Sequence, residues 1–208
     1  IQNPKVSSKY FSYVIAPNHD NLKGRNIINS TGALHYFKLE NHKDSLDNTN
    51  NANLVSCIIG GENNHYLFSL KEANDLCFKI KDLKKKNSNL NFLVITSRRT
   101  SNQVKNLLKN ELSLFAKVWL GEGKNPYKFA LYNSEFFIIT SDSTSMISEA
   151  SITGKPIYIY QLPFKRKSVR FKRFHEEFNT LKITRDLITS DKLEKWSYDK
   201  LDESKRIA

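Results

Sequence analysis

From residue 54 onward, short apolar runs alternate with stretches of helical periodicity, and this alternation constrains the fold more than any other feature of the sequence. Between the runs, apolar residues recur at intervals of three and four, as in a helix with one buried face. Strands that alternate with helices favour right-handed βαβ units. The sequence therefore predicts an α/β fold, a Rossmann-like parallel sheet with helices on both faces. The predicted strands are residues 54–59, 91–96, 116–120, 135–140 and 156–162.

Capping residues delimit the predicted helices. Ser69 begins a capping box with the glutamate three positions later, and residues 100–103 repeat the pattern. Residues 141–153 form a further predicted helix, which Gly154 ends as a left-handed cap. A basic helix is expected around residues 168–178, and one or two short helices complete the chain.

An Asn-rich stretch at residues 41–53 is the clear linker, and we place a domain boundary within it. Residues 1–45 hold one more predicted strand, at 10–17, then a Gly- and Asn-rich loop. That is too little for a domain, so we predict the trailing segment of an N-terminal Rossmann-like domain. Residues 46–208 are the predicted C-terminal, nucleotide-binding Rossmann-like domain. The chain lacks an initiator Met, so we expect a part upstream.

The net charge of +12 indicates attraction to phosphate, whether in nucleic acid, anionic lipid or a small ligand. Lys and Asn are abundant throughout, so composition accounts for most of this charge. One cluster stands apart, residues 165–173, with six cations around Phe171. It is a candidate for peripheral contact with an anionic membrane, and a solvated helix face is the alternative. No nucleic-acid motif is recognised, so no nucleic-acid partner is expected.

Cys57 and Cys77 lie at apolar positions and are predicted to be buried free thiols in a reducing compartment. No apolar run approaches the roughly 20 residues of a membrane helix, and the first residues do not resemble a signal peptide. We therefore predict a cytoplasmic protein, peripheral to a membrane at most. No motif for a dinucleotide cofactor and no metal-ligand spacing occur, so no cofactor and no metal are expected.

Four loops leave the carboxyl ends of predicted strands, where open parallel sheets bind ligands. Glycines let the backbone approach a ligand, arginines offer planar forks to phosphate, and the start of a helix favours an anion. Together the loops predict a nucleotide or anion pocket. The alternatives are that Ser141 or Asp142 is only an N-cap, that the arginines only pair with carboxylates, and that the helix face shared by Ser145 and Glu149 is only solvated. The predicted ligand-binding residues are Gly60, Gly61, Arg98, Arg99, Asn125, Ser143, Thr144, Ser145 and Glu149.

His19 follows the strand predicted at residues 10–17 and precedes Asp20. A histidine beside an aspartate suits a general base with its orienting carboxylate, so His19 is the candidate catalytic residue. Adjacent residues in a loop seldom reach that geometry, and a structural role is the alternative.

The block SDSTSMISEASITGKPIYIY resembles the donor-site motif of GT-B glycosyltransferases, in which a Ser-rich turn, a Glu and a G-x-P follow in order. More of the chain resembles the "elongated mitochondria" family of mitochondrial-fission proteins and their bacterial relatives. The matching stretches are PNHD, GRNIINSTGALH, IIGG, TSRRT, GKNPY, the Ser-rich block and LDESKRIA. The abundance of Lys and Asn suggests a bacterial member.

This resemblance implies a two-domain, GT-B-like protein with this chain as its C-terminal part. The implied ligand is a nucleoside-diphosphate sugar, with the diphosphate at Ser143, Thr144 and Ser145 and the ribose at Glu149. The implied activity is that of a glycosyltransferase-like enzyme that needs no metal. The alternative is a non-catalytic adaptor in membrane division that retains the fold.

Overall fold

A six-stranded parallel sheet forms the centre of the computed structural model, which describes residues 3–37 and 53–208. Its strand order is β5-β4-β3-β6-β7-β8, and every neighbouring pair is parallel. This confirms the predicted α/β fold. The strands are β3 (Leu54–Ile59), β4 (Asn91–Thr96), β5 (Ala116–Trp119), β6 (Phe136–Thr140), β7 (Ile157–Tyr160) and β8 (Thr184–Asp186).

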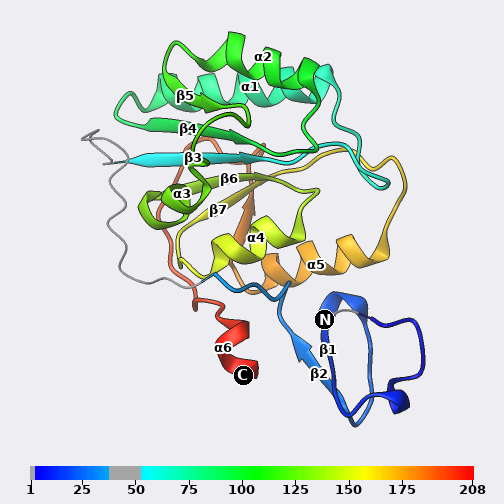
Figure 1. Cartoon of the computed structure of the whole chain (residues 1–208). Coiled ribbons are helices and arrows are strands. Elements are labelled where there is room, and N and C mark those ends of the chain that lie inside the picture. Colours follow the sequence, from blue (N-terminus) through cyan, green and yellow to red (C-terminus); the bar gives the residue numbers. More distant parts are fainter. Residues whose placement is uncertain (1–2, 38–52) are drawn as a thin grey trace.

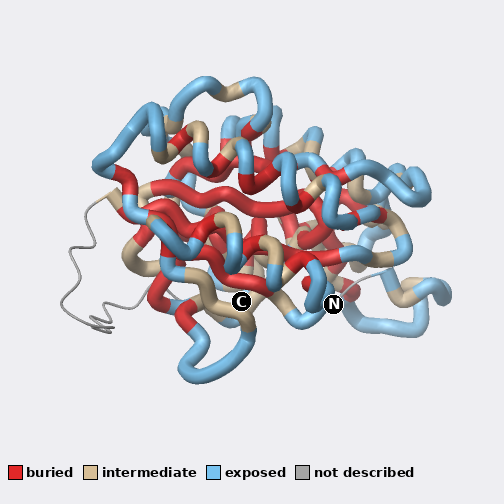
Figure 2. The backbone as a smooth tube through the Cα atoms, turned by 90° about the horizontal axis from the view of Figure 1, so that it is seen from above, coloured by how far each residue is buried: buried red, intermediate tan, exposed pale blue. Residues whose placement is uncertain are grey.

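Helices cover both faces of this sheet (Figure 1). Side chains of a strand point alternately to its two faces, so Val55, Cys57 and Ile59 of β3 pack with the helices of one face. Ile58 packs with those of the other. In Figure 2 the buried backbone, in red, runs through the middle of the molecule, and the exposed backbone, in pale blue, lies around it. One face carries α1 (Leu70–Lys86) and α2 (Asn102–Leu112), and the other carries α3 (Tyr127–Asn133), α4 (Thr144–Ser151) and α5 (Val169–Thr180).

The capping box predicted at the start of α1 is present. The Ser69 hydroxyl accepts a hydrogen bond from the Lys71 N–H at 3.2 Å, and the Glu72 carboxylate accepts one from the Ser69 N–H at 2.9 Å. Two backbone N–H groups at the start of α1, those of Ser69 and Lys71, thereby have acceptors.

We expect Ser69→Ala to lower the free energy of unfolding by about 1 kcal/mol, because the N-cap acceptor is lost. Urea denaturation followed by circular dichroism measures this. Ser88→Ala, in the exposed turn after α1, is the control and should change stability by less than about 0.5 kcal/mol. Equal effects of the two substitutions would contradict the capping role.

Several predicted boundaries are wrong. The strand predicted at residues 10–17 is only four residues long, as β1 (Val14–Pro17). Its partner β2 (Ile27–Ser30) lies in the predicted loop. The N-cap of α2 is Ser101 rather than Thr100. The Thr100 hydroxyl donates to the Gly60 carbonyl instead. β8 was not predicted. Most of the Asn-rich linker and the boundary between residues 45 and 46 lie outside the described residues.

The helix predicted from residue 141 begins at Thr144, and its N-cap is Ser143 rather than Ser141 or Asp142. Ser141 cannot serve because its groups have other partners. Its hydroxyl accepts from the Leu162 N–H at 3.0 Å, and its carbonyl bonds the His175 Nε2 at 2.9 Å. The turn at residues 141–143 is therefore held by the residues just after β7 and by α5 before the helix starts.

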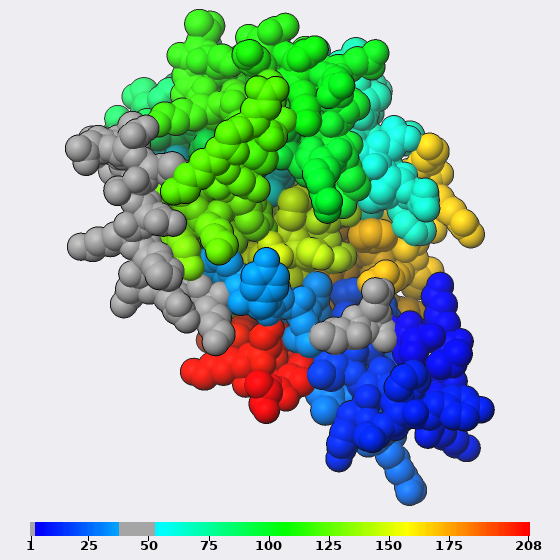
Figure 3. Space-filling view, viewed as in Figure 1, coloured from blue at the N-terminus to red at the C-terminus, as the bar shows by residue number. Residues whose placement is uncertain are grey.

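The N-terminal segment forms a separate two-stranded parallel sheet from β1 and β2. A short 3-10 turn between them, η2 (Asn18–Asp20), contacts α5. Asp20 forms an ion pair with Arg170 at 2.6 Å, and the Asn18 amide donates to Glu177 at 2.5 Å. The C-terminal helix α6 (Glu203–Ile207) touches the segment near β2, as the blue and red surfaces show in Figure 3.

Candidate functional site

The strand order of the sheet reverses beside β3. The chain runs from β3 outward through β4 and β5, then returns to the other side of β3 as β6. Ligands of open α/β sheets bind at such a reversal, outside the carboxyl ends of the strands. The two loops that flank this point begin at Gly60 and Ser141.

Asp142 ties three of the strand-end loops together. Its side chain is fully buried, and its carboxylate accepts hydrogen bonds from the Gly61 N–H at 3.0 Å and the Thr140 hydroxyl at 2.6 Å. Arg99 completes the set with an ion pair at 2.5 Å. Sequence reasoning considered Asp142 only as a cap. A carboxylate directly after the central strand β6 was the available signal.

Gly60 and Gly61 are explained by packing within the chain. A Cβ at Gly60 would lie 2.2 Å from each Asp142 carboxylate oxygen, and a Cβ at Gly61 would lie 2.2 Å from the Arg99 carbonyl oxygen. Real Cβ atoms do not approach so closely. Both glycines are thus required by the loop contacts at the strand reversal, whether or not a ligand also approaches them.

The two arginines differ in their surroundings. Arg99 is half-exposed and paired with Asp142, which matches the alternative of pairing with a carboxylate. Arg98 is exposed, and no ion pair to it occurs within the described residues. Of this pair, Arg98 is the one whose guanidinium is fully available to an anion.

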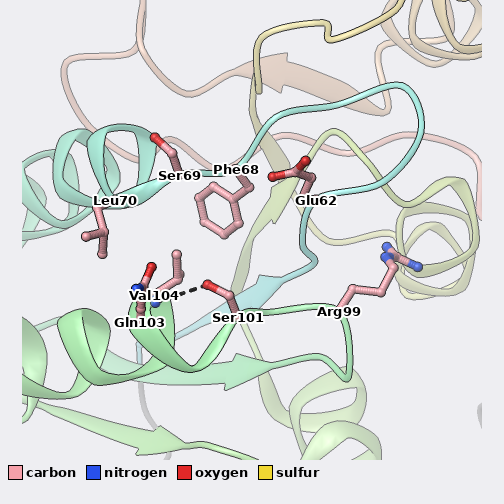
Figure 4. A pocket seen from close by; sticks show the side chains of 8 residues that line it. All are labelled: Glu62, Phe68, Ser69, Leu70, Arg99, Ser101, Gln103 and Val104. Atoms are coloured by element: carbon pink, nitrogen blue, oxygen red, sulfur yellow. Dashed lines mark hydrogen bonds between the residues drawn. The ribbon is translucent and has the colours of Figure 1, made fainter.

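A cavity of about 400 Å³ opens between the first turns of α1 and α2. Its serines are already engaged, because Ser69 and Ser101 accept from N–H groups of their own helices. Figure 4 shows the Arg99 guanidinium turned away from Gln103 and Val104. The cavity therefore offers few free polar groups, and it is a weaker anion site than the strand reversal. The remaining lining residues are Glu62, Phe68 and Leu70.

The first turn of α4 has free backbone donors. The Ser143 hydroxyl accepts from the Met146 N–H at 3.5 Å, whereas no acceptor for the N–H groups of Thr144 or Ser145 occurs in the described part of the chain. Ser145 is exposed and Thr144 half-buried. This turn can accept an anion through those donors and the helix dipole.

Glu149 lies one turn further along α4 and is held by a residue of α3. The Tyr127 hydroxyl donates a short hydrogen bond to Glu149 Oε2. Asn125 in turn accepts from the Tyr127 N–H at 2.9 Å. Burial, with Glu149 beside it, raises the pKa of Tyr127, so the phenol stays a donor. Sequence reasoning singled out Asn125 and Glu149 but missed Tyr127.

His19 is only 1% exposed, and its ring meets Phe174 edge-on at 5.3 Å. Neither ring nitrogen has a hydrogen-bond partner among residues 3–37 and 53–208. Burial, and then the Arg170 charge, lowers its pKa to about 4. The imidazole is therefore neutral at pH 7, as a base requires, but its nitrogens are enclosed.

The basic cluster at residues 165–173 is partly neutralised. Lys165 pairs with Glu62 at 2.8 Å, Arg170 pairs with Asp20, and Lys172 lies 3.6 Å from Glu176. Contact of this cluster with a membrane stays a prediction. Within the described residues, no helix combines the length and apolarity that a membrane span requires.

The family model described as mitochondrial fission ELM1 matches residues 1–208. The chain belongs to the mitochondrial fission ELM1 family. An uncharacterized protein of Rickettsia prowazekii, RP120, is 32% identical over 219 residues, which cover 100% of this chain and 60% of that protein. The mitochondrial fission protein ELM1 of Arabidopsis thaliana is 32% identical over 118 residues, covering 55% of this chain and 27% of that protein. The chain thus spans at most three fifths of either relative.

Among solved structures, a UDP-GlcNAc 2-epimerase from Neisseria meningitidis bound to UDP-GlcNAc overlaps part of this ELM1-family chain. Its TM-score is 0.37 and its sequence identity 18%, and the overlap covers 52% of this chain and 27% of the epimerase. This similarity is too partial to indicate the ligand of the ELM1-family chain.

Proposed function

We propose that this chain binds a nucleoside-diphosphate sugar at the carboxyl edge of its sheet, as the C-terminal part of a two-domain, GT-B-like protein. One observation carries the proposal. The free first turn of α4 and the carboxylate of Glu149 lie one helical turn apart beside the strand reversal. A donor group for an anion and an acceptor for hydroxyls at that spacing suit a diphosphate joined to a ribose.

The diphosphate would bind the N–H groups of Thr144 and Ser145, where the helix dipole favours negative charge. The exposed guanidinium of Arg98, in the loop that follows β4, is the candidate for a second contact. Arg99 donates to Asp142 through one Nη2, and its half-exposed guanidinium keeps further N–H donors. No metal is needed in this scheme, because the helix and the arginines supply the positive field.

In the longer protein we propose that the bound sugar is transferred to an acceptor. The bond between the anomeric carbon and the diphosphate oxygen breaks, and the acceptor forms the new bond to that carbon. The charge that develops on the leaving diphosphate is stabilised by the α4 turn. A base must take the acceptor proton. His19 stays the predicted base, and it would have to become accessible to act.

A thermal-shift panel of UDP, GDP, ADP and CDP and their sugar conjugates tests the binding. At least one nucleotide should raise the melting temperature of the wild-type chain. Glu149→Ala should abolish that shift, because the hydroxyl acceptor is lost. Glu176→Ala, which removes a surface carboxylate from α5, is the control and should keep it.

A wild-type chain that no nucleotide stabilises would contradict the proposal. If the chain instead binds anionic liposomes and loses this binding on charge reversal of the exposed Arg166 and Lys167, the adaptor alternative would be favoured. Both experiments use the same purified chain, so the two functions are separated directly.

A further inference from the structure

We propose that Tyr127 is a positioning residue that lets Glu149 distinguish ribonucleotides from 2′-deoxyribonucleotides. The phenol holds one carboxylate oxygen of Glu149 and leaves the other for a sugar hydroxyl. This inference rests on the proposed function, since it concerns the same nucleotide site.

The geometry assigns the two oxygens of Glu149 different tasks. Oε2 accepts the hydrogen bond from the Tyr127 hydroxyl. Oε1 has no partner in the part of the chain that the structure describes, and Glu149 is only half-buried. Helical side chains lean toward the N-terminus of their helix, so Glu149 leans over the turn that carries Ser145. The carboxylate therefore lies over the same face of α4 as the proposed diphosphate site.

Tyr127 is itself fixed at both ends. Its backbone N–H donates to the Asn125 side chain at 2.9 Å, which anchors the start of α3. Its ring packs against the buried cluster that includes Leu131 and Ile147. A glutamate without such a partner would exchange among rotamers, and ordering it on binding would cost free energy. Tyr127 orders the carboxylate before the nucleotide arrives.

The hydrogen-bonding chemistry of Tyr127 and Glu149 predicts which sugar the pair can distinguish. A carboxylate accepts hydrogen bonds and the Tyr127 phenol already supplies one donor, so the remaining oxygen needs a second donor. A ribose offers neighbouring 2′- and 3′-hydroxyls as donors, whereas a 2′-deoxyribose keeps only the 3′-hydroxyl, and we assign the 2′-hydroxyl to Oε1. A hydrogen bond to a charged acceptor is worth roughly tenfold to a hundredfold in affinity. We expect the wild-type chain to prefer the ribonucleotide by that factor.

The test compares Tyr127→Phe with Tyr198→Phe. The control also removes one phenol hydroxyl from a half-buried tyrosine beside the same cluster, where it donates to the Lys155 carbonyl at 2.7 Å. Titration calorimetry measures dissociation constants for the nucleoside diphosphate that the thermal-shift panel selects and for its 2′-deoxy form. Tyr127→Phe should weaken the ribonucleotide roughly tenfold or more and leave the deoxy form nearly unchanged. Tyr198→Phe should keep the wild-type ratio.

Three outcomes are distinguishable. A wild-type chain that binds no nucleotide contradicts the proposed function. A wild-type chain that binds both sugars equally overturns only the role of Tyr127, as does a Tyr127→Phe variant that keeps the wild-type ratio. If Tyr127→Phe does not fold, Glu149→Gln supplies the test. Tyr127 would hold its amide oxygen and turn the amide NH₂ toward the sugar, so a neutral hydrogen bond would replace the charge-assisted one. The ratio should therefore fall, and an unchanged ratio would overturn the inference.

Discussion

Gly61→Ala should lower the free energy of unfolding by about 3 kcal/mol, at the upper end of what overpacking costs. The added Cβ would lie 2.2 Å from the Arg99 carbonyl oxygen and 2.3 Å from its carbon. These are backbone atoms, so no flexible side chain can move aside. Relief requires the two loops to separate, which also stretches the bond from the Gly61 N–H to Asp142. Urea denaturation measures the loss.

Gly123→Ala is the matched control for this substitution. Gly123 has a φ of +71°, and nothing lies within 4 Å of the position that its Cβ would take. Only the left-handed backbone is penalised there, which costs about 1 kcal/mol. Equal losses at Gly61 and Gly123 would show that the loop contact at the strand reversal does not constrain the chain.

Between pH 7.5 and pH 4.0, the free energy of unfolding of the wild-type chain should fall by about 3 kcal/mol more than that of the His19→Phe variant. Burial lowers the pKa of His19 from 6.5 to about 4 in the folded chain. As pH falls, the unfolded chain therefore takes up this proton first, so wild-type stability is retained above pH 6.5 and lost progressively down to about pH 4. A phenyl ring keeps the edge contact with Phe174 and does not titrate.

Urea denaturation of both proteins at pH 7.5 and pH 4.0 measures the effect as a difference of differences. The Asp20 carboxylate, the Arg170 guanidinium and the His175 imidazole also face this site. They are present in both proteins, so their contributions largely cancel. If the variant loses as much stability as the wild type between these pH values, His19 is not buried as the structure describes.

Much of the fold could be predicted because its strands are buried on both faces. β3 and β4 occupy the predicted residues, since continuous apolar runs leave little choice of register or length. β2 and β8 escaped prediction because they are short and mixed in polarity, as in the Thr-Arg-Asp of β8. Their pairing depends on backbone bonds to a neighbour, which sequence periodicity does not reveal.

The site was less predictable than the fold. Topology alone brings the strand-end loops to one edge, so Gly61, Arg99 and the Ser-rich turn could be placed together from sequence. The separate role of each of these residues could not be predicted, because the roles depend on Asp142, whose partners lie far away in the chain. The bond from Tyr127 to Glu149 likewise depends on how α3 and α4 pack.

The place of β3 at the centre of the sheet has a consequence for biosynthesis. β3 is the first strand of the sheet to leave the ribosome, yet one of its two edges must wait for β6, where Val55 pairs with Phe136. Until then, an apolar strand presents unpaired backbone groups, the arrangement that invites association with other nascent chains. A chain truncated before Phe136 would be left with that edge of β3 permanently open.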